Sequence, residues 1–126
     1  MRLTRNFSSE EFDSKDGASM PNIVLKNIST LAVQLQTIRD YIDRPIKINS
    51  GYRSPAHNKS IGGVKNSQHV KGKASDIVIK GLSTSQVYRI IEQLIEDGKI
   101  IQGGLGLYKG FVHYDIRGKK ARWDNR

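Results

Sequence analysis

SQHVKGKASDIVI, residues 67–79, carries the transition from a glycine-containing loop into a hydrophobic strand. Ala74–Ile79 is predicted to be that strand, and because side chains alternate along a strand, Asp76 lies on one of its two faces. His69 lies seven residues before Asp76, and Gly72 between them lets the link fold back toward the strand. A histidine and an aspartate at this spacing are common by chance. The pair therefore raises the question of a shared site and does not answer it.

The flanking segments predict an α+β fold with a small, mainly antiparallel sheet packed against two or three helices. Apolar residues that recur every three or four positions predict a helix over 22–42. A second helix is predicted to begin at the capping box of Ser83 and Gln86 and to end at Gly98. Further strands are predicted over 45–50, 104–108 and 111–117. Residues 51–72 have the composition of a long loop, which in a compact domain is usually functional.

Length and composition favour one domain over residues 1–126. The 21 lysines and arginines exceed the 12 acidic residues and give a net charge of +9. This excess favours a polyanionic partner, such as nucleic acid, anionic lipid or an acidic wall polymer. Cysteine is absent, which excludes disulfides and thiolate ligands, so that any metal must be held by nitrogen and oxygen atoms. No apolar segment approaches the length of a membrane span.

The stretch FVHYDIR, residues 111–117, offers a further histidine on a predicted strand. His113 and Asp115 lie on one face of this strand, and the alternate residues give it an apolar face toward a core. The chain has three histidines, and His69, Asp76 and His113 would supply the three protein ligands of a catalytic zinc ion. The alternative is that all three residues make ordinary structural hydrogen bonds. His57, in a turn, is expected to bond locally.

Four stretches, SGYRSPAHN, SQHVKGKASD, FVHYDIRG and ARW, together resemble the zinc D-alanyl-D-alanine carboxypeptidase family of murein peptidases. The resemblance is strongest to its compact single-domain branch, found in phage lysins and bacterial cell-wall enzymes. The residues that match the family pattern Ser-x-His-x-x-Gly-x-Ala-x-Asp are Ser67, His69, Gly72, Ala74 and Asp76. The similarity runs in order through nearly the whole chain.

This resemblance implies that His69, Asp76 and His113 hold one Zn²⁺ on the sheet face. It also implies that Arg53 lies over the substrate and stabilises an oxyanion, and that Ser67 lies near the bound peptide.

Aromatic side chains are candidates for the walls of a peptide groove. Tyr52, beside Arg53, is a candidate substrate contact, and Tyr108, Phe111 and Tyr114 could also line a groove. Aromatic residues on the strands of a small domain are more often core. Trp123, in the basic C-terminal tail, is expected to pack back on the domain.

One position departs from the wider family. Many members place an acidic general base three residues before the last zinc histidine, where this chain has Gly110. Asp115 is the nearest carboxylate on the strand face of His113. It is therefore a candidate either for the catalytic base or for orienting the metal site.

The expected function is that of a zinc metallopeptidase that cleaves peptidoglycan stem peptides through a metal-activated water, of the D-Ala-D-Ala carboxypeptidase or endopeptidase type. A phage endolysin or another cell-wall lytic enzyme is expected. A monomer without a nucleic-acid partner is expected. The N-terminal residues lack the apolar region of a signal peptide, so synthesis in the cytoplasm and action on the wall after release are expected. The alternatives are an inactive zinc-containing wall-binding module and a basic nucleic-acid-binding domain.

Overall fold

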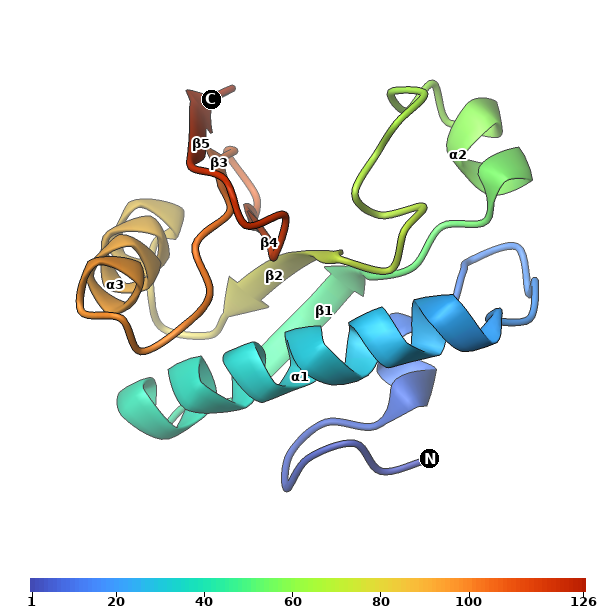
Figure 1. The fold of residues 1–126 in the computed structure, drawn as a ribbon. Helices are drawn as coiled ribbons and strands as arrows, with labels where there is room; N and C mark the ends of the chain where they lie inside the picture. Colours follow the sequence, from blue (N-terminus) through green and yellow to red (C-terminus); the bar gives the residue numbers. More distant parts are fainter.

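The computed structural model describes residues 1–126 and consists of a five-stranded sheet with helices packed around it (Figure 1). The helices are a short 3-10 helix η1 (Ser9–Phe12), α1 (Asn22–Ile42), α2 (Pro55–Ser60) and α3 (Thr84–Glu96). The strands are β1 (Ile46–Ser50), β2 (Ala74–Ile79), β3 (Gly104–Leu107), β4 (Val112–Asp115) and β5 (Ala121–Asp124). The fold class is α+β, as the sequence predicted. None of the helices is long and apolar enough to span a lipid bilayer.

The sheet is mixed, with strand order β1-β2-β4-β3-β5. All pairs are antiparallel except β3 with β5, which runs parallel. β5 lies in the tail for which the sequence predicted only that Trp123 would pack back. Trp123 does pack back, and it does so as part of this edge strand.

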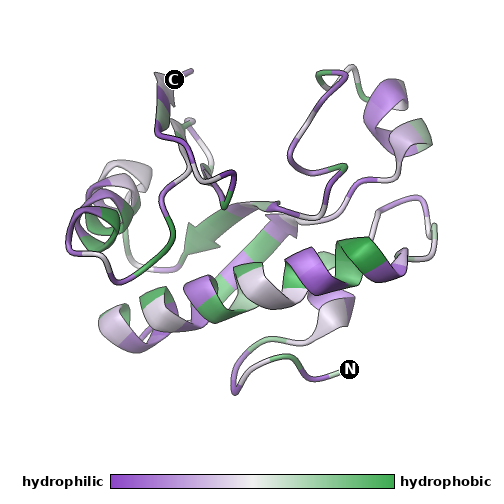
Figure 2. Cartoon of the chain, viewed as in Figure 1, coloured by the Kyte–Doolittle hydropathy of each residue, from purple (hydrophilic) through white to green (hydrophobic).

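The hydrophobic core lies between the sheet and the helices α1 and α3. Buried apolar residues of α1 recur at Ile28, Leu31, Leu35 and Ile38, which places them on one side of the helix. Figure 2 shows hydrophobic residues on β1 and β2 and as stripes along α1 and α3, whereas the segment around α2 is mainly hydrophilic. The core therefore occupies one face of the sheet and leaves the other face available for polar side chains.

The segment 51–72 is only partly the loop that its composition predicted, because it contains α2. Ser54 caps this helix by accepting a hydrogen bond from the backbone N–H of His57, and Pro55 occupies the first turn. A capping serine followed by proline is a recognised signal for a helix start. The remaining loop, 61–73, returns to β2 and brings His69 against the sheet.

Candidate metal centre

The centre of the site is a row of residues in register across the sheet. Asp76 on β2 pairs directly with His113 on β4, and His113 pairs with Gly106 on β3. Gly106 in turn pairs with Trp123 on β5. Residues paired in this way share a face of the sheet, so Asp76 and His113 project together. Because Gly106 has no side chain, the Trp123 ring can lie over it. The ring centroids of Trp123 and His113 are then 5.1 Å apart.

His69 reaches the same point from the loop before β2. Its backbone N–H bonds to the Ser67 hydroxyl, and the N–H of Gly72 bonds to its carbonyl. Gly72 has a φ of +74°, in the left-handed region that glycine adopts at low cost. This tight turn folds His69 back over β2. His69 Nε2 then lies 3.3 Å from Asp76 Oδ1, and His113 Nδ1 lies 3.1 Å from the same oxygen.

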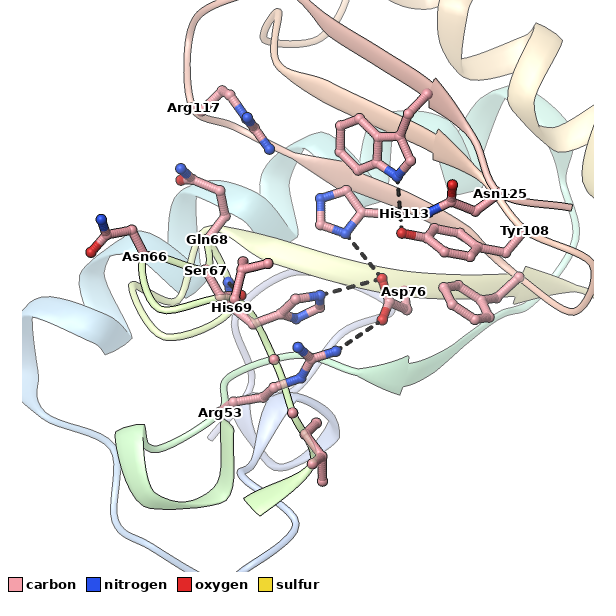
Figure 3. Close-up of a pocket in the computed structure, with 16 residues that line it drawn as sticks. Arg53, Asn66, Ser67, Gln68, His69, Asp76, Tyr108, His113, Arg117 and Asn125 are labelled. Atoms are coloured by element: carbon pink, nitrogen blue, oxygen red, sulfur yellow. Dashed lines mark hydrogen bonds and ion pairs between the residues drawn. The ribbon is translucent and has the colours of Figure 1, made fainter. Parts of the chain in front are cut away.

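Three potential ligand atoms therefore converge, one from each of His69, Asp76 and His113, within 4.8 Å of one another. All three side chains are buried. Figure 3 shows both imidazoles directed toward Asp76 from different elements. Two imidazole nitrogens and one carboxylate oxygen are the ligand types and the number that a catalytic zinc site uses. These residues could hold a metal ion.

The other nitrogen of each imidazole has a fixed partner. His69 Nδ1 lies 2.7 Å from the carbonyl oxygen of Gly51 and can only donate to it, which leaves Nε2 with its lone pair toward the site. His113 Nε2 lies 2.6 Å from Asp115 Oδ2, so its proton is held there and Nδ1 can face the site. Such partners set the tautomer and ring orientation of metal-binding histidines.

The electrostatics of the cluster follow from burial and from these contacts. Burial alone would raise the pKa of Asp76, but hydrogen bonds from His113 and His69 outweigh it and lower the pKa below its usual value. Burial opposes the charging of His113, yet the carboxylates of Asp115 and Asp76 raise its pKa. The site is therefore a set of tightly coupled charges that favours deprotonated carboxylates.

Asp115 lies behind His113 and does not line the cleft. It is 0% exposed. Its two oxygens accept hydrogen bonds from His113, from the backbone of Gly104, and from the backbone and guanidinium of Arg117. Burial would raise the pKa of Asp115, but the hydrogen bonds from His113, Arg117 and Gly104 lower it. A carboxylate enclosed in this way exposes no oxygen to the cleft.

A cleft of about 640 Å³ opens over the cluster. One wall comes from the α2–β2 loop and the other from the β3–β5 end of the sheet (Figure 1). Asp76 is the only acidic residue in its lining, and no side chain exists at Gly110 to supply another. The cleft thus contains no free carboxylate.

Arg53 lies in this cleft, held loosely beside the cluster. Its Nη2 lies 3.4 Å from Asp76 Oδ2, its Nη1 lies 3.4 Å from Asn58 Oδ1, and its Nε lies 3.3 Å from the Ser50 hydroxyl. Ser67 also lines the cleft, although it is mostly buried. The structure therefore brings both predicted polar residues to the site.

The aromatic candidates divide between core and cleft. Tyr52 is 4% exposed, belongs to the hydrophobic core and does not line the cleft, so the predicted substrate contact does not fit its position. Tyr114 is also core. Tyr108 and Phe111 line the cleft as a stacked pair with ring centroids 4.4 Å apart. Tyr114 lies on β4, whereas Phe111 precedes that strand, and alternation over the predicted strand 111–117 already places the two on opposite faces. No sequence signal separates Tyr52 from the cleft residues.

His57 is the remaining candidate from the sequence, and Arg117 and Asn58 are two residues that the sequence did not indicate. His57 lies on α2, outside both the cluster and the cleft. Arg117 and Asn58 were not singled out from the sequence, although both contact predicted site residues. Arg117 is two positions from Asp115 on an extended segment, a spacing that could have indicated their contact.

The chain is similar to one protein family and to a curated enzyme. The family model described as Peptidase M15 matches residues 4–115. The chain is also similar to a zinc D-Ala-D-Ala carboxypeptidase of Streptomyces albus G, with 42% identity over 45 residues. That similarity covers 35% of this chain and 18% of the relative, so the chain spans only a small part of the relative's length.

Proposed function

This chain belongs to the peptidase M15 family, and we propose that the bond it hydrolyses lies in the stem peptides of peptidoglycan. The family resemblance indicated by the sequence motifs is thereby confirmed. The enzyme is a zinc metallopeptidase, and the observation that carries the assignment is the convergence of His69, Asp76 and His113 in one cleft. The curated relative, a zinc D-Ala-D-Ala carboxypeptidase, supports a wall peptide as the substrate.

We assign the zinc ligands to His69 Nε2, Asp76 Oδ1 and His113 Nδ1. The donor set fits zinc, because each imidazole is held by its other nitrogen and Asp76 is held as a carboxylate. A zinc ion in such a site supplies a Lewis acid that polarises a carbonyl group and lowers the pKa of water.

Arg53 is proposed to stabilise the developing oxyanion of the scissile carbonyl. It is the cleft cation nearest to the cluster, and its three contacts are all 3.3–3.4 Å long, so it can shift toward a substrate oxygen at little cost. Ser67 is proposed to contact the peptide. Its oxygen accepts the N–H of His69, and its own proton can be donated to a peptide carbonyl.

Asp115 is proposed to be a positioning residue and not the catalytic base. Its burial and its contacts with His113 and Arg117 favour the second of the two roles that the sequence left open. In this role it fixes the His113 ring and keeps the proton on Nε2.

A lytic role fits the charge of the molecule. The net charge of +9 favours approach to an acidic wall polymer. We propose that the chain acts on the wall as an endolysin or a related lytic enzyme, after release from the cell in which it is made.

The proposed function is tested by incubating the chain with purified peptidoglycan and analysing the released fragments by mass spectrometry. The native chain should release peptide fragments, a chelator should abolish the release, and zinc should restore it. His69→Ala should be inactive, whereas the matched control His57→Ala, which changes the histidine outside the cluster, should retain activity. Bound zinc without any cleavage by the native chain would contradict the proposal and favour a wall-binding module.

A further inference from the structure

Arg117 presents an unused part of its guanidinium to the cleft. We infer that this group binds a carboxylate of the substrate, beside the zinc site. The inference rests on the proposed peptidase function and adds the chemical class that the substrate must contain near its scissile bond. Arg117 lines the cleft and its side chain is 31% exposed. In Figure 3 its guanidinium points toward the side of the cleft where His113 lies.

The hydrogen bonds of Arg117 leave one nitrogen free. Nε donates to Asp115 Oδ1 at 2.9 Å, and Nη2 donates to Asp115 Oδ2 at 2.8 Å. No hydrogen bond in the structure involves Nη1. A guanidinium has five N–H donors in a fixed plane, so anchoring one edge on Asp115 leaves Nη1 donors available to a ligand.

The side chain is also held in place before any ligand arrives. The bidentate pair with Asp115 fixes one edge of the guanidinium, and its central carbon lies 5.5 Å from the centre of the Trp123 ring. A long side chain that is already ordered loses little rotational freedom on binding, which increases the affinity gained from each contact.

The charges around the cleft favour an anion. Arg53 and Arg117 are the only lysine or arginine residues in its lining, and Asp76 is the only acid. With buried Asp115 included, the two arginines balance the two aspartates. A divalent metal ion on the His69–Asp76–His113 cluster therefore leaves a positive excess, which attracts a carboxylate and disfavours a cationic group.

A stem peptide offers two carboxylates that could meet Arg117. One is the C-terminal carboxylate of a D-Ala-D-Ala end. The other is the free α-carboxylate of a γ-linked D-glutamate. Both have the planar geometry that an arginine recognises, and separate probes distinguish them.

The test uses two pairs of peptides, each with a carboxylate and its neutral amide. The first pair is diacetyl-L-Lys-D-Ala-D-Ala and its C-terminal amide. The second is N-acetyl-L-Ala-γ-D-Glu-L-Lys amide and the same peptide with D-isoglutamine. Affinities are measured by calorimetry with the full chain, both zinc-loaded and after chelation. Binding to the chelated chain requires no hydrolysis, so this readout is independent of whether the chain is a peptidase.

Native protein should bind the carboxylate member of one pair about tenfold or more tightly than the amide, as expected for a hydrogen-bonded charge. The pair that shows the preference identifies the carboxylate. Arg117→Gln should reduce the preference to less than about twofold, and Arg117→Lys should retain part of it. The matched control is Arg126→Gln, because Arg126 makes the same bidentate contact with an aspartate two residues earlier but lies outside the cleft.

Two results would overturn the inference. One is a native chain that does not distinguish the members of either pair. The other is an Arg117→Gln variant that weakens both members of a pair equally, which is the result of a purely structural role through Asp115. Thermal melting of each variant verifies folding, and Arg117→Lys tests the inference if the glutamine variant does not fold.

Discussion

Replacing Asp115 by asparagine changes one atom of a buried side chain and removes the charge behind His113. In the native chain Oδ1 accepts the N–H groups of Gly104 and Arg117 and the Nε–H of Arg117, at 2.9, 3.1 and 2.9 Å. Oδ2 accepts from His113 Nε2 at 2.6 Å and from Arg117 Nη2 at 2.8 Å. An asparagine has one acceptor oxygen, so its NH₂ group must replace one of these two acceptors.

The less costly orientation keeps the amide oxygen at the Oδ1 position, where three donors meet it. The NH₂ group then faces His113 Nε2, which must accept a hydrogen bond and therefore lose its proton. The proton moves to Nδ1, the atom assigned to the metal. Loss of such a partner typically weakens metal binding 10- to 100-fold, which corresponds to about 1.4–2.8 kcal/mol. We expect Asp115→Asn to lower zinc affinity by this factor.

The assay is competition for zinc between the chain and a chromophoric chelator. Asp124→Asn is the matched control, because Asp124 pairs with Arg126 as Asp115 does with Arg117 but is half exposed, contacts no proposed ligand and does not line the cleft. The control should bind zinc within about twofold of the native chain, the range expected of a surface pair. Unchanged zinc affinity in Asp115→Asn, combined with a large loss of kcat, would refute the positioning role and indicate that Asp115 moves a proton during the reaction.

Three further predictions concern catalysis, pH and folding. Arg53→Ala should lower kcat by about 10²–10³, the usual effect of losing an oxyanion donor, while elemental analysis still finds one zinc per chain; loss of zinc instead would show a structural role. Hydrogen bonds from the Ser54 and Ser14 hydroxyls lower the pKa of Asp16 from 3.8 in the unfolded chain to about 2 in the folded chain. The Asp16 carboxylate therefore stabilises the fold fully above pH 3.8, and this stabilisation is lost as the pH falls through about 2. Asp16→Asn should therefore melt below the native chain at neutral pH, and a difference in Tm that did not shrink between neutral pH and pH 2 would contradict this. Gly72→Ala should lower the free energy of unfolding by more than the ~1–2 kcal/mol of left-handed strain, because its Cβ would lie 2.7 Å from Val24 Cγ1. Gly62→Ala, with a similar φ and open space around it, measures the strain alone in the same denaturant titration, and equal losses in the two variants would contradict the clash.

The elements that the sequence predicted well are those with a strong local pattern. The helix over 22–42 and the strand Ala74–Ile79 have the predicted bounds, because an apolar face of constant period must meet a core. The capping box at Ser83 and Gln86 also forms as predicted. β5 was missed because its residues are only partly buried and pair in parallel with a distant strand, and neither property leaves a local pattern.

The metal cluster could be proposed from residue types, but its geometry depends on strand register. Asp76 and His113 are 37 positions apart and meet because β2 and β4 pair them directly. A shift of one residue would send one of them to the core face. The enclosed position of Asp115 likewise depends on the pairing of β3 with β4, which brings the backbone N–H of Gly104 to its carboxylate, a contact that no spacing rule specified.

The central claim is that a single zinc ion on His69, Asp76 and His113 is required for peptide hydrolysis. The most direct test adds zinc stepwise to chelator-treated chain and follows the rate of stem-peptide release from peptidoglycan. The rate should start near zero, rise linearly and stop rising at one equivalent of zinc per chain. Full hydrolysis before any zinc is added, or a rate that does not respond to zinc, would contradict the claim.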